Sequence, residues 1–192
     1  MTGTYGETLT NYSGTITVDG FDTSLGTLES VTVSLQGNLS TVLTVTAGAS
    51  GATDVNSYTS VTFTLSDAGG YVSLGRDVSS DHYTISSMTP NEVVTSGTLT
   101  GTDTRTTAAL TSAGVLQEFT ASTVTFATTG TAATWNSYTG GNVTTAQVTY
   151  GDEVVTVTYN YTVVPEPATW AMLFGGFGAL VLVQRMRRLK VA

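Results

Sequence analysis

Apolar and polar residues alternate along most of the chain, which is the pattern of strands with one buried face. The clearest run is VTVTYNYTV, in which Val155, Val157, Tyr159, Tyr161 and Val163 alternate with threonine and asparagine. Similar runs predict strands at residues 28–35, 41–47, 58–65, 93–99, 119–126 and 143–150, with shorter strands at 15–18 and 82–85.

Turn-forming residues separate these runs. Clusters of Gly, Asp and Asn predict turns at residues 19–20, 37–38, 48–51, 67–70, 140–142 and 151–152. Residues 108–118 are the only stretch of the body with helix-friendly content, and they predict one or two helical turns between sheets. Many strands joined by short turns, without amphipathic helices between them, predict an all-β fold, an antiparallel β-sandwich.

Composition supports strands and narrows the chemistry. Threonine and valine are abundant, and their branched side chains suit a pleated surface better than a disordered chain. The absence of cysteine excludes a disulfide framework, a thiol nucleophile and a cysteine-ligated zinc or iron–sulfur site.

Charge is distributed unevenly. The formal net charge is -8, yet residues 1–184 carry 14 acidic residues and only two basic ones, Arg76 and Arg105, for a net charge of -12. An acidic body repels phosphate backbones, so no nucleic-acid partner is predicted. The remaining basic residues form a C-terminal cluster, which consists of Arg185, Arg187, Arg188 and Lys190.

The alternating pattern ends at Ala168. Residues 168–183 contain no charge and only one polar side chain, that of Thr169. As a helix this stretch spans about 24 Å. Bilayer thinning and snorkelling arginines accommodate such a length, so it predicts a single C-terminal transmembrane helix. The basic cluster directly after it predicts that the C-terminus is cytoplasmic and the β-domain lies outside.

The order of these C-terminal features resembles a known sorting signal. Val164, Pro165, Glu166 and Pro167 precede the apolar stretch and the terminal basic cluster. This order resembles the PEP-CTERM signal of exported proteins in Gram-negative bacteria that make exopolysaccharide. The resemblance implies a membrane-embedded partner, exosortase, that recognises the Pro-Glu-Pro segment and processes the protein. It also implies transit through the inner membrane to the cell surface or extracellular matrix.

The prolines fit this interpretation, because each removes an amide donor and holds the preceding residue extended. The alternative is that they only separate strand from helix and the domain stays anchored by a single span. The predicted division is a β-sandwich surface domain at 1–162 and a sorting signal at 163–192. The signal comprises the motif at 165–167, the helix at 168–183 and the basic tail at 184–192.

A signal of this kind also implies an N-terminal signal peptide. Residues 1–14 contain no basic n-region and no apolar h-region. We therefore expect either a start codon assigned too far downstream or a trimmed N-terminus.

The body has a resemblance of its own. Residues 20–40, GFDTSLGTLESVTVSLQGNLS, resemble the opening of choice-of-anchor E domains of bacterial surface proteins. The resemblance extends over residues 4–164. It implies architecture and location, and it supplies no reaction.

No catalytic residue, metal site or cofactor is predicted. His82 is the only histidine, and its neighbours Ser80 and Asp81 cannot all share its face of a strand. Three pairs of acidic residues are candidate calcium ligands, although such residues ordinarily satisfy turn backbones. The pairs are Asp19 with Asp22, Asp77 with Asp81, and Asp152 with Glu153.

These observations predict a non-enzymatic surface or extracellular-matrix protein with a structural or adhesive role. The alternative is a carbohydrate-binding module that interacts with exopolysaccharide. Its predicted contacts are Trp135, Tyr138 and Tyr58, which lie in surroundings rich in Gly, Ser and Asn. The competing interpretation is that these rings cover the ends of the core.

Overall fold

The structure is a computed structural model of the chain and describes residues 1–164, 172 and 174–177. Residues 1–164 form ten strands and one α-helix. In chain order these are β1 (Thr2–Leu9), β2 (Tyr12–Asp19), β3 (Gly26–Ala47), β4 (Ala52–Asp67), β5 (Ser73–Ser79), β6 (Tyr83–Met88), β7 (Val93–Thr95), β8 (Leu99–Thr106), α1 (Ala113–Phe119), β9 (Thr123–Thr139) and β10 (Val143–Val163).

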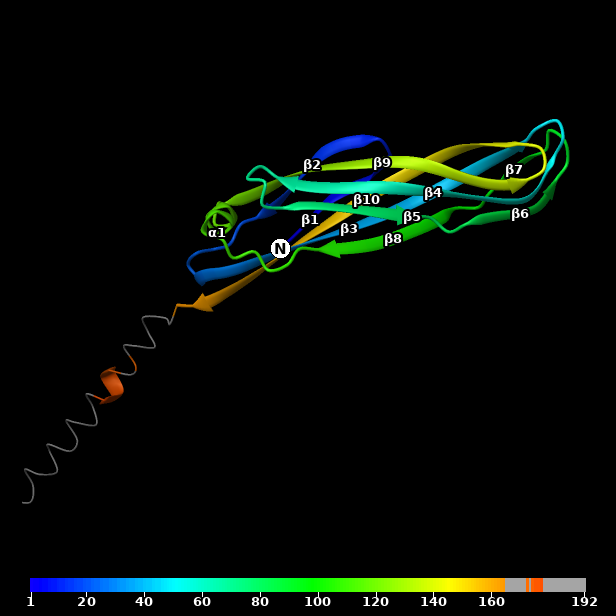
Figure 1. Cartoon of the computed structure of the whole chain (residues 1–192). Helices are drawn as coiled ribbons and strands as arrows, with labels where there is room; N and C mark the ends of the chain where they lie inside the picture. Colours follow the sequence, from blue (N-terminus) through cyan, green and yellow to red (C-terminus); the bar gives the residue numbers. More distant parts are fainter. Residues whose placement is uncertain (165–171, 173, 178–192) are drawn as a thin grey trace, which may run out of the picture.

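The strands form two antiparallel sheets of five strands each, as the alternating pattern predicted. Sheet A has the order β1-β10-β3-β7, and β8 also pairs with β3. Sheet B has the order β2-β9-β4-β5, and β6 also pairs with β4. Figure 1 shows an elongated body with α1 at one end, called the proximal end here, and β6 and β7 at the distal end. β10 leaves the body at the proximal end (Figure 1).

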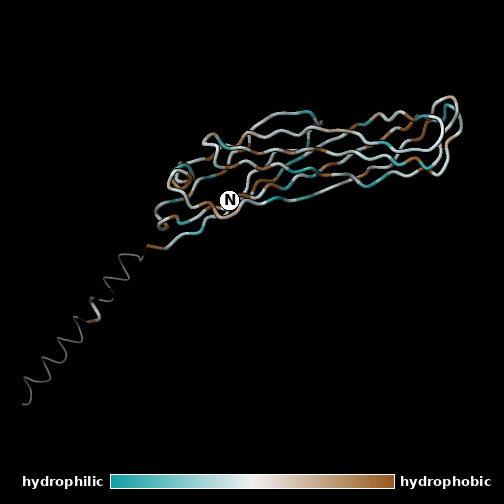
Figure 2. The backbone as a smooth tube through the Cα atoms, in the orientation of Figure 1, coloured by the Kyte–Doolittle hydropathy of each residue, from teal (hydrophilic) through white to brown (hydrophobic). Residues whose placement is uncertain are grey.

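Hydrophobic and hydrophilic residues alternate along the strands (Figure 2), so each sheet turns an apolar face to the other. Buried side chains of both sheets form two separate clusters. The proximal cluster has twenty buried residues and includes Leu35 of β3, Phe63 of β4 and Phe126 of β9. The distal cluster has six, namely Val45, Ala47, Ala52, Val55, Met88 and Val143.

Two predicted turns are wrong for one physical reason. Gly37 lies inside β3 and Gly151 lies inside β10, and the two long strands pair without interruption past both glycines. A Cβ atom on Gly37 would lie 2.3 Å from Cδ2 of Phe63, and one on Gly151 would lie 3.0 Å from Cε1 of the same ring. These glycines therefore make room for a phenylalanine of the opposite sheet instead of bending the chain.

Other boundaries also differ from the predictions. The strand expected at 93–99 is the short β7 followed by the start of β8, and Phe119 ends α1 instead of beginning a strand. The helix expected at 108–118 is shorter and begins at Ala113. β1 and β5 were not predicted, because glycines and charged residues interrupt their alternation. The turns predicted at 48–51 and 140–142 fall between strands, and those predicted at 19–20 and 67–70 begin at the last residues of β2 and β4.

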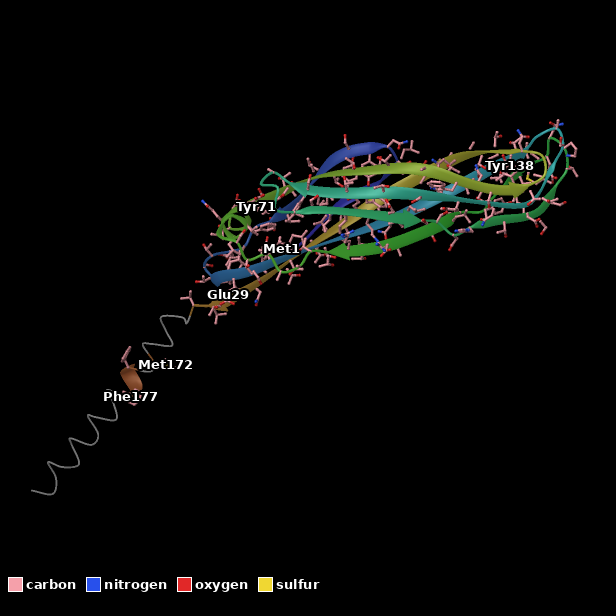
Figure 3. The ribbon with its side chains drawn as sticks, viewed as in Figure 1. Met1, Glu29, Tyr71, Tyr138, Met172 and Phe177 are labelled. Carbon is pink, nitrogen blue, oxygen red and sulfur yellow. The ribbon has the colours of Figure 1, made fainter. Side chains whose placement is uncertain are left out.

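The predicted transmembrane helix at 168–183 lies mostly outside the described residues. Met172 and residues 174–177 are helical, and Figure 3 labels Met172 and Phe177 there. Within residues 1–164, 172 and 174–177, we find no helix with the length and apolar character that crossing a bilayer requires.

Candidate functional site

β10 brings the chain out of the sandwich at the point where the predicted sorting signal begins. The amide of Val164 donates to the carbonyl of Leu25 over 3.4 Å. The side chains of Val163 and Val164 are 65% and 59% exposed. The chain is therefore open to solvent directly before the Pro-Glu-Pro segment. Of the predicted motif only Val164 is described, because Pro165, Glu166 and Pro167 lie outside the described residues, as do Arg185, Arg187, Arg188 and Lys190.

Aromatic rings beside this exit pack against the core. Phe21 lies 5.0 Å from Tyr161 and 5.7 Å from Tyr159, measured between ring centroids. The hydroxyl of Tyr159 donates to the carbonyl of Asp19 over 2.9 Å, and burial raises the pKa of Tyr159 to about 12. An apolar pocket of about 320 Å³ adjoins them. These rings cover the proximal end of the core, as aromatic residues of sandwiches commonly do.

A row of three nearly parallel rings crosses the outer face of sheet B. Tyr58 of β4 is the register partner of Trp135 of β9, and their ring centroids lie 6.5 Å apart at an interplanar angle of 15°. The ring of His82, between β5 and β6, stacks on Tyr58 at 4.5 Å and 10°. The indole of Trp135 is 55% exposed. The aromatic row, as we call these three residues, therefore presents an open indole at one end.

Tyr138 does not belong to the aromatic row. It is three residues from Trp135 on the same strand, so its side chain points to the opposite face of sheet B. Figure 3 shows Tyr138 at the distal end of the body. The structure thus brings together two of the three predicted carbohydrate contacts and adds His82. Periodicity placed Tyr58 on a strand, whereas Trp135 lay between predicted strands and is part of β9, which continues to Thr139. Their juxtaposition depends on a register between β4 and β9 that periodicity does not specify.

The side chains around His82 have structural partners. The Ser80 hydroxyl accepts a hydrogen bond from the amide of Thr59 over 3.1 Å and donates to the carbonyl of Asp81 over 2.8 Å. Nδ1 of His82 lies 3.0 Å from Oδ1 of Asn56. Ser80 is thus engaged with backbone and His82 with an amide, an arrangement that differs from a nucleophile paired with its base.

A carboxylate is enclosed between the sheets. Glu153 of β10 is fully buried, and it accepts hydrogen bonds from the hydroxyls of Tyr12, over 2.7 Å, and Thr128. Burial raises the pKa of Glu153 and outweighs these two hydrogen bonds, which act in the opposite direction. Burial likewise raises the pKa of Tyr12 well above its ordinary value. Sequence reasoning missed this site, because it placed Glu153 beside a predicted turn, whereas Glu153 lies inside β10 on the same face as the buried Val155 and Val157.

Hydroxyls connect the two sheets between the apolar clusters. The Oγ1 atoms of Thr41 and Thr149 lie 2.7 Å apart, and those of Thr41 and Thr59 lie 3.3 Å apart. Thr59 also donates to Oε1 of Gln147 over 2.8 Å. Thr59 belongs to sheet B, and the other three belong to sheet A. These four residues form what we call the hydroxyl belt, which satisfies its own hydrogen bonds inside the sandwich.

Four of the six candidate calcium ligands, namely Asp22, Asp77, Asp152 and Glu153, accept hydrogen bonds from neutral donors. Asp22 accepts the amide of Ser24 over 2.9 Å, and hydrogen bonds from Ser24 lower the pKa of its carboxyl. Asp77 accepts the hydroxyl of Thr62 over 2.6 Å, and Asp152 accepts the amide group of Asn38 over 2.7 Å. Within the part of the chain that the structure describes, no three acidic or histidine side chains converge to hold a metal ion.

An open pocket of about 630 Å³ lies where β8 approaches β5, at the edge between the two sheets. Its lining combines hydroxyl, amide and carboxylate groups with apolar surface. It consists of Asn38, Leu39, Ser40, Ser79, Asp81, Thr100, Gly101, Thr102 and Asp152. The amide of Asp81 donates to the carbonyl of Thr100 over 3.0 Å, which ties the two sheet edges together.

Comparisons with known proteins locate one recognisable segment. No curated protein matches the chain. Among solved structures, a chain in "Structure of infectious bursal disease virus Gx strain" is 13% identical, with a TM-score of 0.18, over 97% of this chain and 46% of that one. A score this low carries no argument about fold or function. The resemblance of residues 4–164 to choice-of-anchor E domains finds no support here and stays a prediction. Residues 163–188 match the family model of the PEP-CTERM protein-sorting motif, which supports an exported protein that is sorted by exosortase.

Proposed function

We propose that this chain is a non-enzymatic bacterial surface protein with a structural or adhesive role in the envelope or extracellular matrix. The observation that carries the proposal is the match of residues 163–188 to the PEP-CTERM protein-sorting motif. An elongated, hydroxyl-rich sandwich that ends in an exposed strand directly before this motif supports it further. In this proposal residues 1–162 are the delivered domain and residues 163–192 are the sorting signal.

The proposed route uses the C-terminal segment twice. Residues 168–183 hold the protein in the inner membrane as a transmembrane helix, and Arg185, Arg187, Arg188 and Lys190 keep its end on the cytoplasmic side. Exosortase then acts at Pro165, Glu166 and Pro167, outside the membrane. The support for both steps is the residue order of the tail, with its single uncharged stretch between the prolines and the basic cluster.

A non-enzymatic role rests on the partners of the titratable groups. The histidine lies against Tyr58 and Asn56, and Glu153 is closed off from solvent. An active site ordinarily gathers several titratable groups in one cleft. Among the described residues, His82 and Glu153 lie on different elements and each is engaged in packing or hydrogen bonding.

The test of this proposal is the intact mass of the mature protein. We expect the surface-exposed form from a strain with active exosortase to lack the basic cluster. The same protein from a strain without exosortase should retain the full C-terminal mass. Recovery of the basic cluster on the surface-exposed form of the first strain would overturn processing.

The second candidate function is carbohydrate binding to exopolysaccharide. The specific observation in its favour is the aromatic row of Trp135, Tyr58 and His82 on the outer face of sheet B. Tyr138, the third predicted contact, leaves the other face of the sheet and is given no role in the proposed site.

A further inference from the structure

We propose that Trp135, at the open edge of β9, stacks on a pyranose ring of a neutral polysaccharide, supported from behind by Tyr58 and His82. This proposal rests on the second candidate function above and names its subsite and its class of ligand. It does not depend on how the protein is sorted.

Trp135 is exposed at the end of the aromatic row, whereas the central ring, Tyr58, is partly buried. Tyr58 lies between His82 and Trp135, so both neighbours shield it, whereas Trp135 has a partner ring on one side only. The indole is 55% exposed although tryptophan is ordinarily well buried in sandwiches. The rings behind it fix its orientation, since the bond between Nδ1 of His82 and Oδ1 of Asn56 holds the far end of the row. An oriented aromatic ring loses little conformational entropy when a ligand covers it.

β9 has a free strand edge beside the indole. β2 pairs with β9 only as far as Tyr12 opposite Gly130, and Oδ1 of Asn11 then accepts the amide of Ala132. Beyond that point the described partner of β9 is β4 alone. The carbonyl of Gly130 and the amide of Ala132 point toward β2 and the Asn11 that precedes it. Because backbone groups alternate in direction along a strand, the amides and carbonyls of Thr134 and Asn136 point to the same side, which is open there. These backbone groups flank Trp135 and are available to sugar hydroxyls.

The charge of the body selects an uncharged ligand. The aromatic row and its flanking groups are rings, amides and hydroxyls. The two basic residues of the body lie elsewhere, in β5 and β8, where Arg76 pairs with Asp103. Residues 1–184 carry a net charge of -12, so an anionic polymer would be repelled. A neutral pyranose fits both parts of the site, because its C–H face packs against an electron-rich ring and its hydroxyls reach the strand edge.

The experiment is native affinity electrophoresis of the full chain in a detergent without a sugar headgroup. One gel contains hydroxyethyl cellulose as the neutral probe, a second contains laminarin, and a third contains alginate as the polyuronate. We expect at least one neutral polymer to retard the protein and alginate to leave its mobility unchanged. Trp135→Ala should weaken retardation by about tenfold, which corresponds to the loss of one stacked ring. Tyr58→Ala should weaken it less, because it only removes the support of the indole.

Tyr138→Ala is the matched control, since it removes an aromatic ring from the same strand on the other face. Its retardation should equal that of the wild type. Equal loss in the Trp135→Ala and Tyr138→Ala variants would overturn the subsite, while wild-type retardation would still support carbohydrate binding. Retardation of the wild type by neither neutral polymer would overturn the proposal and the second candidate function together. If the protein associated with itself through Trp135 and no neutral polymer retarded it, the free edge of β9 would serve strand pairing. That result would also overturn the proposed sugar subsite. The sorting proposal is decided separately, by the mass measurement.

Discussion

The proximal and distal halves of the sandwich use the same two sheets in different ways. In the proximal half, β1 and β2 flank β10 and β9, and α1 closes the end over a cluster of twenty buried residues. In the distal half, β9 and β10 continue past the ends of these flanking strands, and the cluster has six buried residues. The hydroxyl belt lies between the two. In Figure 3, Tyr71 marks the proximal half, beside α1, and Tyr138 marks the distal half.

The two halves differ in the amount of core that they bury and in the surface that they leave exposed. Most of the buried apolar surface is proximal, next to the segment that leads into the sorting motif. The distal half buries less and leaves Trp135 and an edge of β9 exposed. An exposed strand edge is a liability unless something manages it. We therefore assign the stable core to the proximal half and the interaction surface to the distal half.

The largest expected effect is the loss of a proximal aromatic ring. Phe126 is fully buried in the proximal cluster, and its removal by Phe126→Ala should lower the free energy of unfolding by about 4 kcal/mol. Met88→Ala in the distal cluster should cost about 2 kcal/mol, because its smaller surroundings relax more easily. Urea unfolding of the full chain measures both. Equal costs would contradict the assignment of stability to the proximal half.

A second substitution tests the packing between the sheets. Gly37→Ala places a methyl group 2.3 Å from Cδ2 of Phe63, so the ring must move and the variant should lose about 2 kcal/mol. Gly75→Ala is the matched control, because no atom lies within 4 Å of its added Cβ and β5 is also a strand. The control should be neutral or slightly stabilising in the same unfolding experiment. A tolerated Gly37→Ala would show that Phe63 does not fix the interior there.

The hydroxyl belt should respond differently from the solvent-facing hydroxyls. Thr41→Val keeps the shape of the side chain but leaves the buried hydroxyls of Thr149 and Thr59 short of a partner, at a cost of about 1.5 kcal/mol. Thr44→Val, on the outer face of the same strand, should change stability by less than about 0.5 kcal/mol. Thermal unfolding of the two variants compares them directly. Identical melting curves would mean that the belt contributes nothing to the joint between the halves.

The smallest expected effect is a change in the pH dependence of stability. The pKa of Glu153 is raised in the folded state. At pH values between the ordinary pKa and this raised pKa, the folded protein therefore holds a proton that the unfolded chain has released. Stability from this group is full below the ordinary glutamate pKa of about 4.3 and falls as the pH rises through the higher folded value. Glu153→Gln should remove this decline while keeping a buried polar group. Urea midpoints measured across the acidic to neutral range should therefore flatten in the variant. An unchanged slope would contradict the raised pKa.

The sequence predicted those features that depend on neighbours along the chain. The alternation of Val155, Val157 and Tyr159 identified the last strand, and the side chains of Val155 and Val157 are fully buried. The linear order of the tail likewise identified the sorting signal. Alternation failed at Gly37 and Gly151, where the decisive neighbour is Phe63 of the opposite sheet.

The candidate sites show the same division. Tyr58 and Trp135 were found as aromatic residues in polar surroundings, but their stacking with His82 required the register of β4 with β9 and the position of the β5–β6 connection. Glu153 was weighed only as a calcium ligand in a turn. Its burial follows from the pairing of β10 with β3, which runs straight through the predicted turn. Periodicity could not predict features that arise from contacts between strands distant in the sequence.

The most direct test of the central claim is the location of a protein whose Pro165, Glu166 and Pro167 are all replaced by alanine. Intact cells are labelled with a membrane-impermeant reagent, and the labelled protein is compared with the inner-membrane fraction. We expect the wild type to be labelled at the surface and the variant to remain in the inner membrane with its C-terminal mass intact. Surface labelling of the variant at the wild-type level would contradict sorting through this motif.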